Sequence, residues 1–209
     1  MPARVYEASA KGSYMSGVPG QYDRRPTAAV GPGDVLVVQT NGWASKLIRI
    51  GAILQGEPSL DNHVIIAHHY TDPGTTKEIF WGIEGRPGGT GEIDMRRYLD
   101  SRWTVNNIRQ PKTDAQRATI CAAMTAAVGT RYDWDAIASD AAAALHIEDI
   151  FPNRERWGNQ VPGHVVCSSL AAWGYNKAGL RYPSTHIMPA TTPADWEDFI
   201  SFNKYNRTR

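Results

Sequence analysis

The stretch Val165-Val166-Cys167-Ser168-Ser169-Leu170-Ala171-Ala172-Trp173 joins two patterns. Its first residues are apolar and β-branched, as in a short strand. From Cys167 onward the apolar residues follow helical spacing, which predicts a helix to about Lys177. A cysteine in the first turn of a helix faces unpaired backbone N–H groups and the positive end of the helix dipole, which favour thiolate over thiol. The stretch therefore predicts a nucleophilic cysteine; the alternative is a cysteine packed as a small hydrophobic core residue.

A second segment far upstream carries the matching base. In Asp61-Asn62-His63-Val64-Ile65-Ile66-Ala67, a histidine stands at the start of an apolar run. A general base held on a rigid strand requires such a position, although a hydrogen-bonded structural histidine would also fit. A cysteine nucleophile and its histidine need only meet in space. We therefore expect Cys167 and His63 to belong to one site.

Composition limits the class of protein. The chain has 209 residues, enough for one domain with a sizeable core. It is 42% hydrophobic and 10% aromatic, which argues against disorder, and its net charge of +1 gives no electrostatic reason to expect a nucleic-acid partner. Two cysteines exclude a disulfide framework and a zinc site of four thiolates. Cys121 lies in a helical pattern and is expected to pack in the core.

The ends of the chain differ from its middle. Residues 1–30 are rich in Gly, Pro, Ser and Arg, which predicts an extended or weakly ordered arm that could dock on a partner. Residues 31–200 are expected to form the domain, and residues 201–209 a polar tail. No segment has the apolar length of a signal peptide or a membrane span. We expect a soluble protein that is cytoplasmic at synthesis.

The patterns between residues 31 and 200 predict an α+β fold. Strands are expected at about 35–38, 63–69, 78–84 and 103–108, and helices at about 43–51, 113–128, 167–177 and 193–199. Residues 93–99 are expected to form a short turn or helix. The glycine-rich segment 86–91 lacks the Gly-Lys-Ser/Thr ending of a phosphate-binding loop and is predicted to be a surface loop.

Seven short motifs follow one another in a recognisable order. They are Gly33-Asp34-Val35-Leu36-Val37, Ser45-Lys46-Leu47-Ile48-Arg49, Asn62-His63-Val64-Ile65-Ile66, Ile83-Glu84, Arg131-Tyr132-Asp133-Trp134, Val166-Cys167-Ser168-Ser169-Leu170 and Met188-Pro189-Ala190. This order resembles the circularly permuted branch of the NlpC/P60 cysteine hydrolases, over roughly residues 31–200. The resemblance implies a papain-like fold, with a small antiparallel sheet or barrel packed against helices. The histidine strand precedes the cysteine helix, opposite to the order in papain.

The resemblance also implies roles for single residues. Cys167 matches the nucleophile, His63 the base, and Glu84 an acidic position that orients the imidazole in some members. Tyr132 and Asp133 match a motif that lines the substrate cleft of the family. The backbone N–H of Cys167 is the natural oxyanion donor because it lies at a helix N-terminus.

The third, orienting residue has two further candidates besides Glu84. If the strand of His63 continues beyond Ala67, alternation puts His69 on the same face as His63. Asn62 is the other candidate. Both are also expected to lie near the bound substrate.

The function implied by the resemblance is hydrolysis of an amide bond by a Cys-His thiolate mechanism, without a metal or organic cofactor. The expected substrate is a peptide of the bacterial cell wall, such as a peptidoglycan stem peptide. Without an export signal, such an enzyme would need release at lysis or delivery in a virion, as in a bacteriophage tail. The alternatives are an acyltransferase or lipid or ester hydrolase on the same fold, and a non-catalytic structural or binding module that contacts its assembly through the N-terminal arm.

Overall fold

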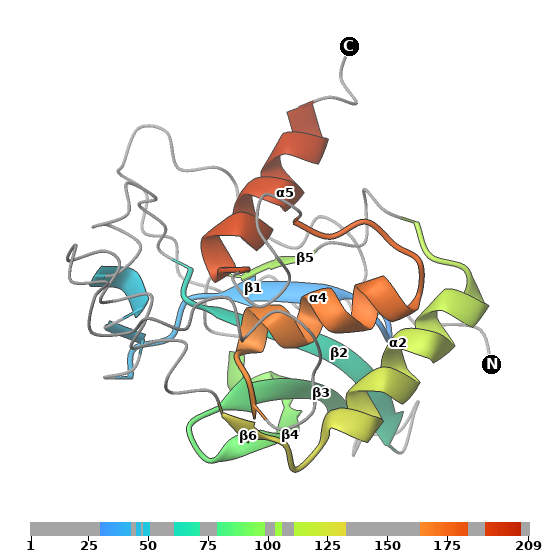
Figure 1. Cartoon of the computed structure of the whole chain (residues 1–209), viewed down its shortest axis with the longest axis horizontal. Coiled ribbons are helices and arrows are strands. Elements are labelled where there is room, and N and C mark those ends of the chain that lie inside the picture. Colours follow the sequence, from blue (N-terminus) through green and yellow to red (C-terminus); the bar gives the residue numbers. More distant parts are fainter. Residues whose placement is uncertain are drawn as a thin grey trace.

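A computed structural model of the chain describes residues 30–42, 45–46, 48–50, 61–71, 79–98, 103–105, 111–132, 164–183 and 191–205. In this part of the chain the fold is α+β, as predicted. A five-stranded antiparallel sheet has the strand order β4-β3-β2-β1-β5. Helices cross one face of this sheet (Figure 1).

The strands have the following bounds: β1 Val35–Val38, β2 His63–Thr71, β3 Ile79–Arg86, β4 Gly89–Asp94 and β5 Trp103–Val105. Strand β4 leads into a short 3₁₀ turn, η1, Met95–Tyr98. Two further short strands, β6 Arg131–Tyr132 and β7 His164–Val165, pair in parallel. The predicted strands at 35–38 and 63–69 are confirmed, and the second extends two residues further. Of the strand predicted at 78–84, the described residues 79–84 are in β3, which also continues two residues further, to Arg86.

The helices are α2 Asp114–Ala127, α4 Cys167–Lys177 and α5 Pro193–Tyr205. Helix α2 begins at a capping box: Thr113 Oγ1 accepts a hydrogen bond from the Gln116 N–H at 3.2 Å, and the Thr113 N–H donates to Gln116 Oε1 at 3.0 Å. Of the helix predicted at 43–51, the described residues 45–46 and 48–50 are helical.

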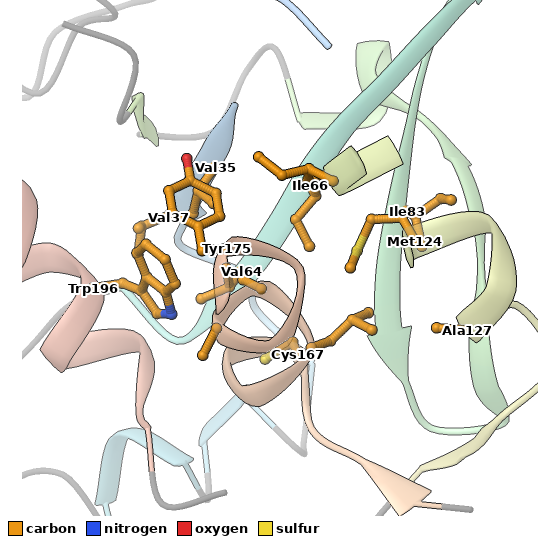
Figure 2. Close-up of a cluster of buried hydrophobic side chains, with 14 residues drawn as sticks. Val35, Val37, Val64, Ile66, Ile83, Met124, Ala127, Cys167, Tyr175 and Trp196 are labelled. Atoms are coloured by element: carbon orange, nitrogen blue, oxygen red, sulfur yellow. The ribbon is translucent and has the colours of Figure 1, made fainter. Parts of the chain in front are cut away.

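The sheet is buried on both faces. Helices α4 and α2 cover one face, where alternate residues of β1, β2 and β3 contact them; Figure 2 shows Val64, Ile66 and Ile83 of this cluster. The opposite face packs against a second apolar cluster that includes Ile65, Phe80 and residues of η1. The near-continuous apolar run in β2 follows from this double burial.

A β-bulge changes the face of the last residues of β2. Ala67 pairs with Gly82, but His69 pairs with Trp81, so His68 is an extra residue in the strand. The bulge turns His69 to the helix-covered side of the sheet. The prediction that His69 shares the face of His63 is therefore wrong, because the extra residue interrupts the period of two.

The glycine-rich segment 86–91 is a tight hairpin and not a surface loop. Arg86 pairs with Gly89, and Pro87 and Gly88 form the turn between β3 and β4. Gly88 has φ of 108° and Gly89 has φ of 117°, values that glycine tolerates best. The sequence prediction was wrong here because the glycines that suggested a loop also permit the hairpin turn and the strand after it.

A buried charged cluster ties the start of β1 to α2. Asp34 Oδ1 accepts hydrogen bonds from Lys112 Nζ at 3.1 Å and Arg117 Nη1 at 3.0 Å. Asp34 Oδ2 accepts one from the Gly31 N–H at 2.8 Å. The side chains of Asp34 and Lys112 are fully buried. This Asp34 cluster fixes the segment before β1 against α2.

The domain boundaries differ slightly from those predicted. Val30 is fully buried, and its carbonyl accepts a hydrogen bond from Tyr70 Oη at 3.2 Å. The rest of the predicted arm, residues 1–29, lies outside the described residues. Helix α5 continues to Tyr205, into the predicted tail, because no glycine or proline interrupts residues 194–205. No described helix is long and apolar enough to cross a membrane.

Candidate active site

Cys167 is the first residue of α4 and is buried, with 2% of its surface exposed. The start of α4 lies directly against β3 at Gly85. A Cβ atom at Gly85 would lie 3.3 Å from the Cys167 nitrogen and 3.4 Å from its Cα, closer than most side chains tolerate. The missing side chain at Gly85 thus allows the helix start to pack on the strand. The predicted position of Cys167 at a helix N-terminus is confirmed.

The first turn of α4 is built without a side-chain cap. Its N-cap residue, Val166, has an extended backbone and an apolar side chain, which offers no acceptor. Ser169 Oγ instead accepts a hydrogen bond from the Val166 N–H at 3.2 Å and donates one to the Val166 carbonyl at 3.1 Å. The N-cap side chain therefore does not compete for the N–H groups beside the Cys167 thiol.

His63 begins β2 and lies beside a carboxylate from the neighbouring strand. Its Nε2 is 2.7 Å from Glu84 Oε2, and both side chains are buried. Glu84 reaches this position because it pairs with Ile65, two residues along β2 and on the same face as His63. An ionised carboxylate only accepts hydrogen bonds, so Nε2 carries the proton. Nδ1 is then the ring nitrogen left to exchange a proton with the Cys167 thiol.

The charge state of His63 reflects both neighbours. Burial by itself would lower the pKa of His63, but the negative charge of Cys167 and a hydrogen bond to it raise the pKa, and Glu84 adds to the effect. The resulting pKa is about 10. The site therefore favours a protonated His63 imidazolium beside the Glu84 carboxylate at neutral pH.

Glu84 is held as an ionised group. Burial would raise the pKa of Glu84, but the hydrogen bond and charge of His63, together with Tyr98 and Arg86, lower it. Tyr98 Oη donates to Glu84 Oε2 at 2.6 Å, and Arg86 Nη1 donates to Oε1 at 3.3 Å. Burial and the charge of Glu84 raise the pKa of Tyr98, so its hydroxyl keeps the proton that it donates.

Sequence reasoning did not single out Tyr98 or Arg86. Tyr98 comes from η1, and its position against Glu84 depends on the path of this short turn under β3, which no periodic pattern specifies. Arg86 follows Glu84 by two residues in β3, so strand alternation could have placed both on one face.

The remaining site candidates lie elsewhere or are not described. The Asn62 amide hydrogen-bonds Thr40: Oδ1 accepts from the Thr40 N–H at 2.9 Å and Nδ2 donates to the Thr40 carbonyl at 2.9 Å. It fastens the end of β1 to the start of β2, which is a structural role and corrects the expectation of an orienting or substrate-binding residue. His69 lies on the opposite face from Glu84, so it does not orient His63.

Of the two residues expected to line the cleft, one is described. Tyr132 is buried in β6 and pairs with Val165, two residues before Cys167. It therefore lies close to the start of α4. Asp133 lies outside the described residues.

The arrangement can perform nucleophilic chemistry. It joins a thiol at a helix N-terminus, an imidazole that can take its proton, and a buried carboxylate that fixes the imidazole tautomer. Elsewhere in the described structure, the possible ligand atoms of His68, His69 and Glu92 lie within 4.8 Å of one another. No family model and no curated protein matches the sequence.

Proposed function

We propose that this protein is a cysteine hydrolase in which Cys167 is the nucleophile, His63 the proton carrier and Glu84 the group that orients His63. One observation carries the proposal: the buried His63 ring is hydrogen-bonded to Glu84 at 2.7 Å, and the charge of Cys167 and a hydrogen bond to it, together with Glu84, raise the pKa of His63 to about 10. A structural histidine would not need a thiol and a carboxylate together.

The reaction follows from these positions. The Cys167 thiolate attacks the acyl carbon, and the oxyanion that forms is stabilised by N–H groups of the first turn of α4. His63 Nδ1 then gives its proton to the leaving amine, and the C–N bond breaks to leave a thioester. His63 next takes a proton from water, whose oxygen attacks the thioester. The acid product leaves, and the thiolate-imidazolium pair is restored.

The resemblance to the circularly permuted NlpC/P60 hydrolases extends this proposal to fold and substrate. In the described structure the histidine strand β2 precedes the cysteine helix α4, which supports the permuted papain-like arrangement. A cell-wall stem peptide is the substrate class that the resemblance implies, and delivery in a bacteriophage virion is the matching setting. Substrate class rests on this analogy, whereas the chemistry rests on the side chains.

Purified peptidoglycan and soluble stem peptides test the proposal directly. We expect the protein to release new amino groups and shortened peptides, which mass spectrometry identifies. Cys167→Ala should abolish release, whereas Cys121→Ala should retain it, because Cys121 belongs to α2 and not to the site. Circular dichroism of both variants checks the fold.

Equal release by the wild type and a folded Cys167→Ala variant would contradict the mechanism. Cleavage of acyl esters without cleavage of wall peptides, still dependent on Cys167, would retain the nucleophile and reject the wall-peptide substrate.

A further inference from the structure

A cluster of possible metal ligands lies at the far end of β2 from His63. His69 Nδ1 is 2.7 Å from His68 Nδ1 and 3.8 Å from Glu92 Oε1. One ligand atom from each of the three residues falls within 4.8 Å of the others. We propose that His68, His69 and Glu92 form a binding site for a divalent transition-metal ion.

The β-bulge is what brings the two histidines together. Consecutive residues of a regular strand point to opposite faces of the sheet, so neighbouring histidines could not bind one ion there. The bulge after Ala67 removes this obstacle: His68 contacts α2 on the helix-covered side, and His69 pairs with Trp81 on the same side. Glu92 of β4 pairs with Ile83 and therefore also faces this side.

His68 is already held as a metal ligand needs to be. Its Nε2 lies 3.1 Å from the Cys121 carbonyl and 2.9 Å from Thr125 Oγ1. A carbonyl only accepts hydrogen bonds, so Nε2 carries the proton and Nδ1 of the neutral ring presents a lone pair. A backbone carbonyl commonly fixes the tautomer of a metal-binding histidine in this way.

His69 can become the second imidazole ligand by moving its ring proton from one nitrogen to the other. Since His68 Nδ1 is an acceptor, the 2.7 Å contact is a hydrogen bond donated by His69 Nδ1. A metal ion would replace the shared proton, and His69 would take its other neutral tautomer, with the proton on Nε2. Both Nδ1 atoms would then bind the ion.

The ligand set indicates which ions would bind. Two imidazoles and one carboxylate suit Zn²⁺, Co²⁺ or Ni²⁺ better than Ca²⁺ or Mg²⁺, which prefer oxygen ligands. The side chains of His69 and Glu92 are 39% and 47% exposed, so solvent ions can reach them.

A role in stability follows from the position of the cluster. His69 lies six residues along β2 from His63, or about 20 Å, which separates the ion from the reacting groups. The ion would join β2 to β4 and, through His68, to α2.

Titration of the tag-free full chain with Zn²⁺ tests the site. Cys167→Ala serves as the background, so that the reactive thiol cannot contribute. Calorimetry should show one ion bound per chain, and Zn²⁺ should raise the midpoint of thermal unfolding. His69→Gln and Glu92→Gln should each weaken binding about tenfold or more and reduce the thermal shift. Glu197→Gln, which changes a carboxylate of α5, is the matched control. It should leave the Zn²⁺ affinity and the thermal shift unchanged.

Failure of the background protein to bind Zn²⁺ would overturn the proposal. If Glu92→Gln and His69→Gln both bound Zn²⁺ as tightly as the background protein, the proposal would be overturned as well, because the ion would then lie elsewhere. The Glu92 side chain is half exposed, so Glu92→Gln is expected to fold. This variant therefore tests the site even if His69→Gln does not fold.

Discussion

Two buried charged clusters contrast in this molecule. The Asp34 cluster pairs a carboxylate with Lys112 and Arg117, and the cluster near the start of α4 pairs the Glu84 carboxylate with His63, whose pKa Cys167 also raises. Both satisfy a buried carboxylate with several hydrogen bonds. They differ in the partners, because an arginine keeps its proton at any ordinary pH whereas a histidine and a cysteine can exchange one.

The difference separates a structural cluster from the one that we propose to be reactive. In the Asp34 cluster the hydrogen-bond partners of the carboxylate are Lys112, Arg117 and the Gly31 N–H, which hold the segment before β1 against α2. In the Cys167 cluster the proton can move between a thiol and an imidazole at the start of a helix. Buried charge alone is therefore poor evidence of a reactive site, and the kind of partner decides.

The largest expected effect comes from Glu84→Gln. The amide keeps the size of the side chain but removes the charge that supports the imidazolium ion. Turnover should fall up to about 10⁴-fold, the loss seen when a triad aspartate becomes asparagine. The pKa of His63 should also decrease, so the alkaline limb of the rate profile should move to lower pH. Measuring turnover at several pH values gives both the loss of rate and the shift of the alkaline limb. A profile identical to that of the wild type would contradict the role of Glu84.

The same variant tests the contribution of His63 to stability. The folded-state pKa of His63 is raised from 6.5 to about 10. Its pairing therefore stabilises the fold fully below pH 6.5 and loses this effect as the pH rises toward 10. The free energy of unfolding should fall over this range in the wild type and fall less in Glu84→Gln. Urea denaturation at several pH values measures the difference.

Asp34→Asn should separate stability from reactivity. The change removes the carboxylate charge that pairs with the buried Lys112 ammonium at 3.1 Å, and breaking a buried pair typically costs about 3–5 kcal/mol. Urea denaturation should show this loss, while the reactivity of Cys167 toward iodoacetamide should stay unchanged in the folded protein. If Asp34→Asn lowered the reactivity of Cys167 without lowering the stability of the fold, the structural role of the Asp34 cluster would be contradicted.

Tyr98→Phe should have a smaller effect. It removes one hydrogen bond to the charged Glu84 carboxylate and leaves the ring packed in its apolar cluster. We expect a loss of about 1.5–3 kcal/mol in the free energy of unfolding. The pKa of Glu84 should rise, since one group that lowers it is removed. Thermal unfolding and the acid limb of the rate profile check these effects.

Arg86→Gln should have the smallest effect. The Arg86 side chain is 43% exposed, and its contact with Glu84 Oε1 is 3.3 Å long. Exposed ion pairs contribute about 0.2–1 kcal/mol. Raising the salt concentration should reduce the difference between this variant and the wild type. A loss as large as that of Tyr98→Phe would show that Arg86 is a main support of Glu84.

Much of the site could be predicted because it sits where patterns change. Cys167 begins a helical run and His63 begins an apolar strand, and such transitions are visible in the sequence. Glu84 was placed by strand alternation together with the family resemblance. The Asn62 and His69 predictions failed for local reasons: Asn62 bonds Thr40 across the β1–β2 connection, and the bulge turns His69 away.

Other features depend on tertiary contacts that sequence patterns do not report. Tyr98 reaches Glu84 through the turn of η1, and Lys112 reaches Asp34 across 78 residues of chain. Local propensity says nothing about such long-range partners. The hairpin at Pro87 was missed for a different reason, because glycine permits both a loop and a tight turn.

The most direct test of the central claim is the rate of Cys167 alkylation by iodoacetamide at pH 6, in a Cys121→Ala background. At this pH an ordinary thiol is almost entirely protonated and reacts slowly. A thiolate-imidazolium pair predicts fast alkylation that drops about 10²-fold in His63→Ala, consistent with the ordinary thiol behaviour expected without a base. Slow alkylation that His63→Ala leaves unchanged would contradict the pair and leave the protein without its proposed nucleophile.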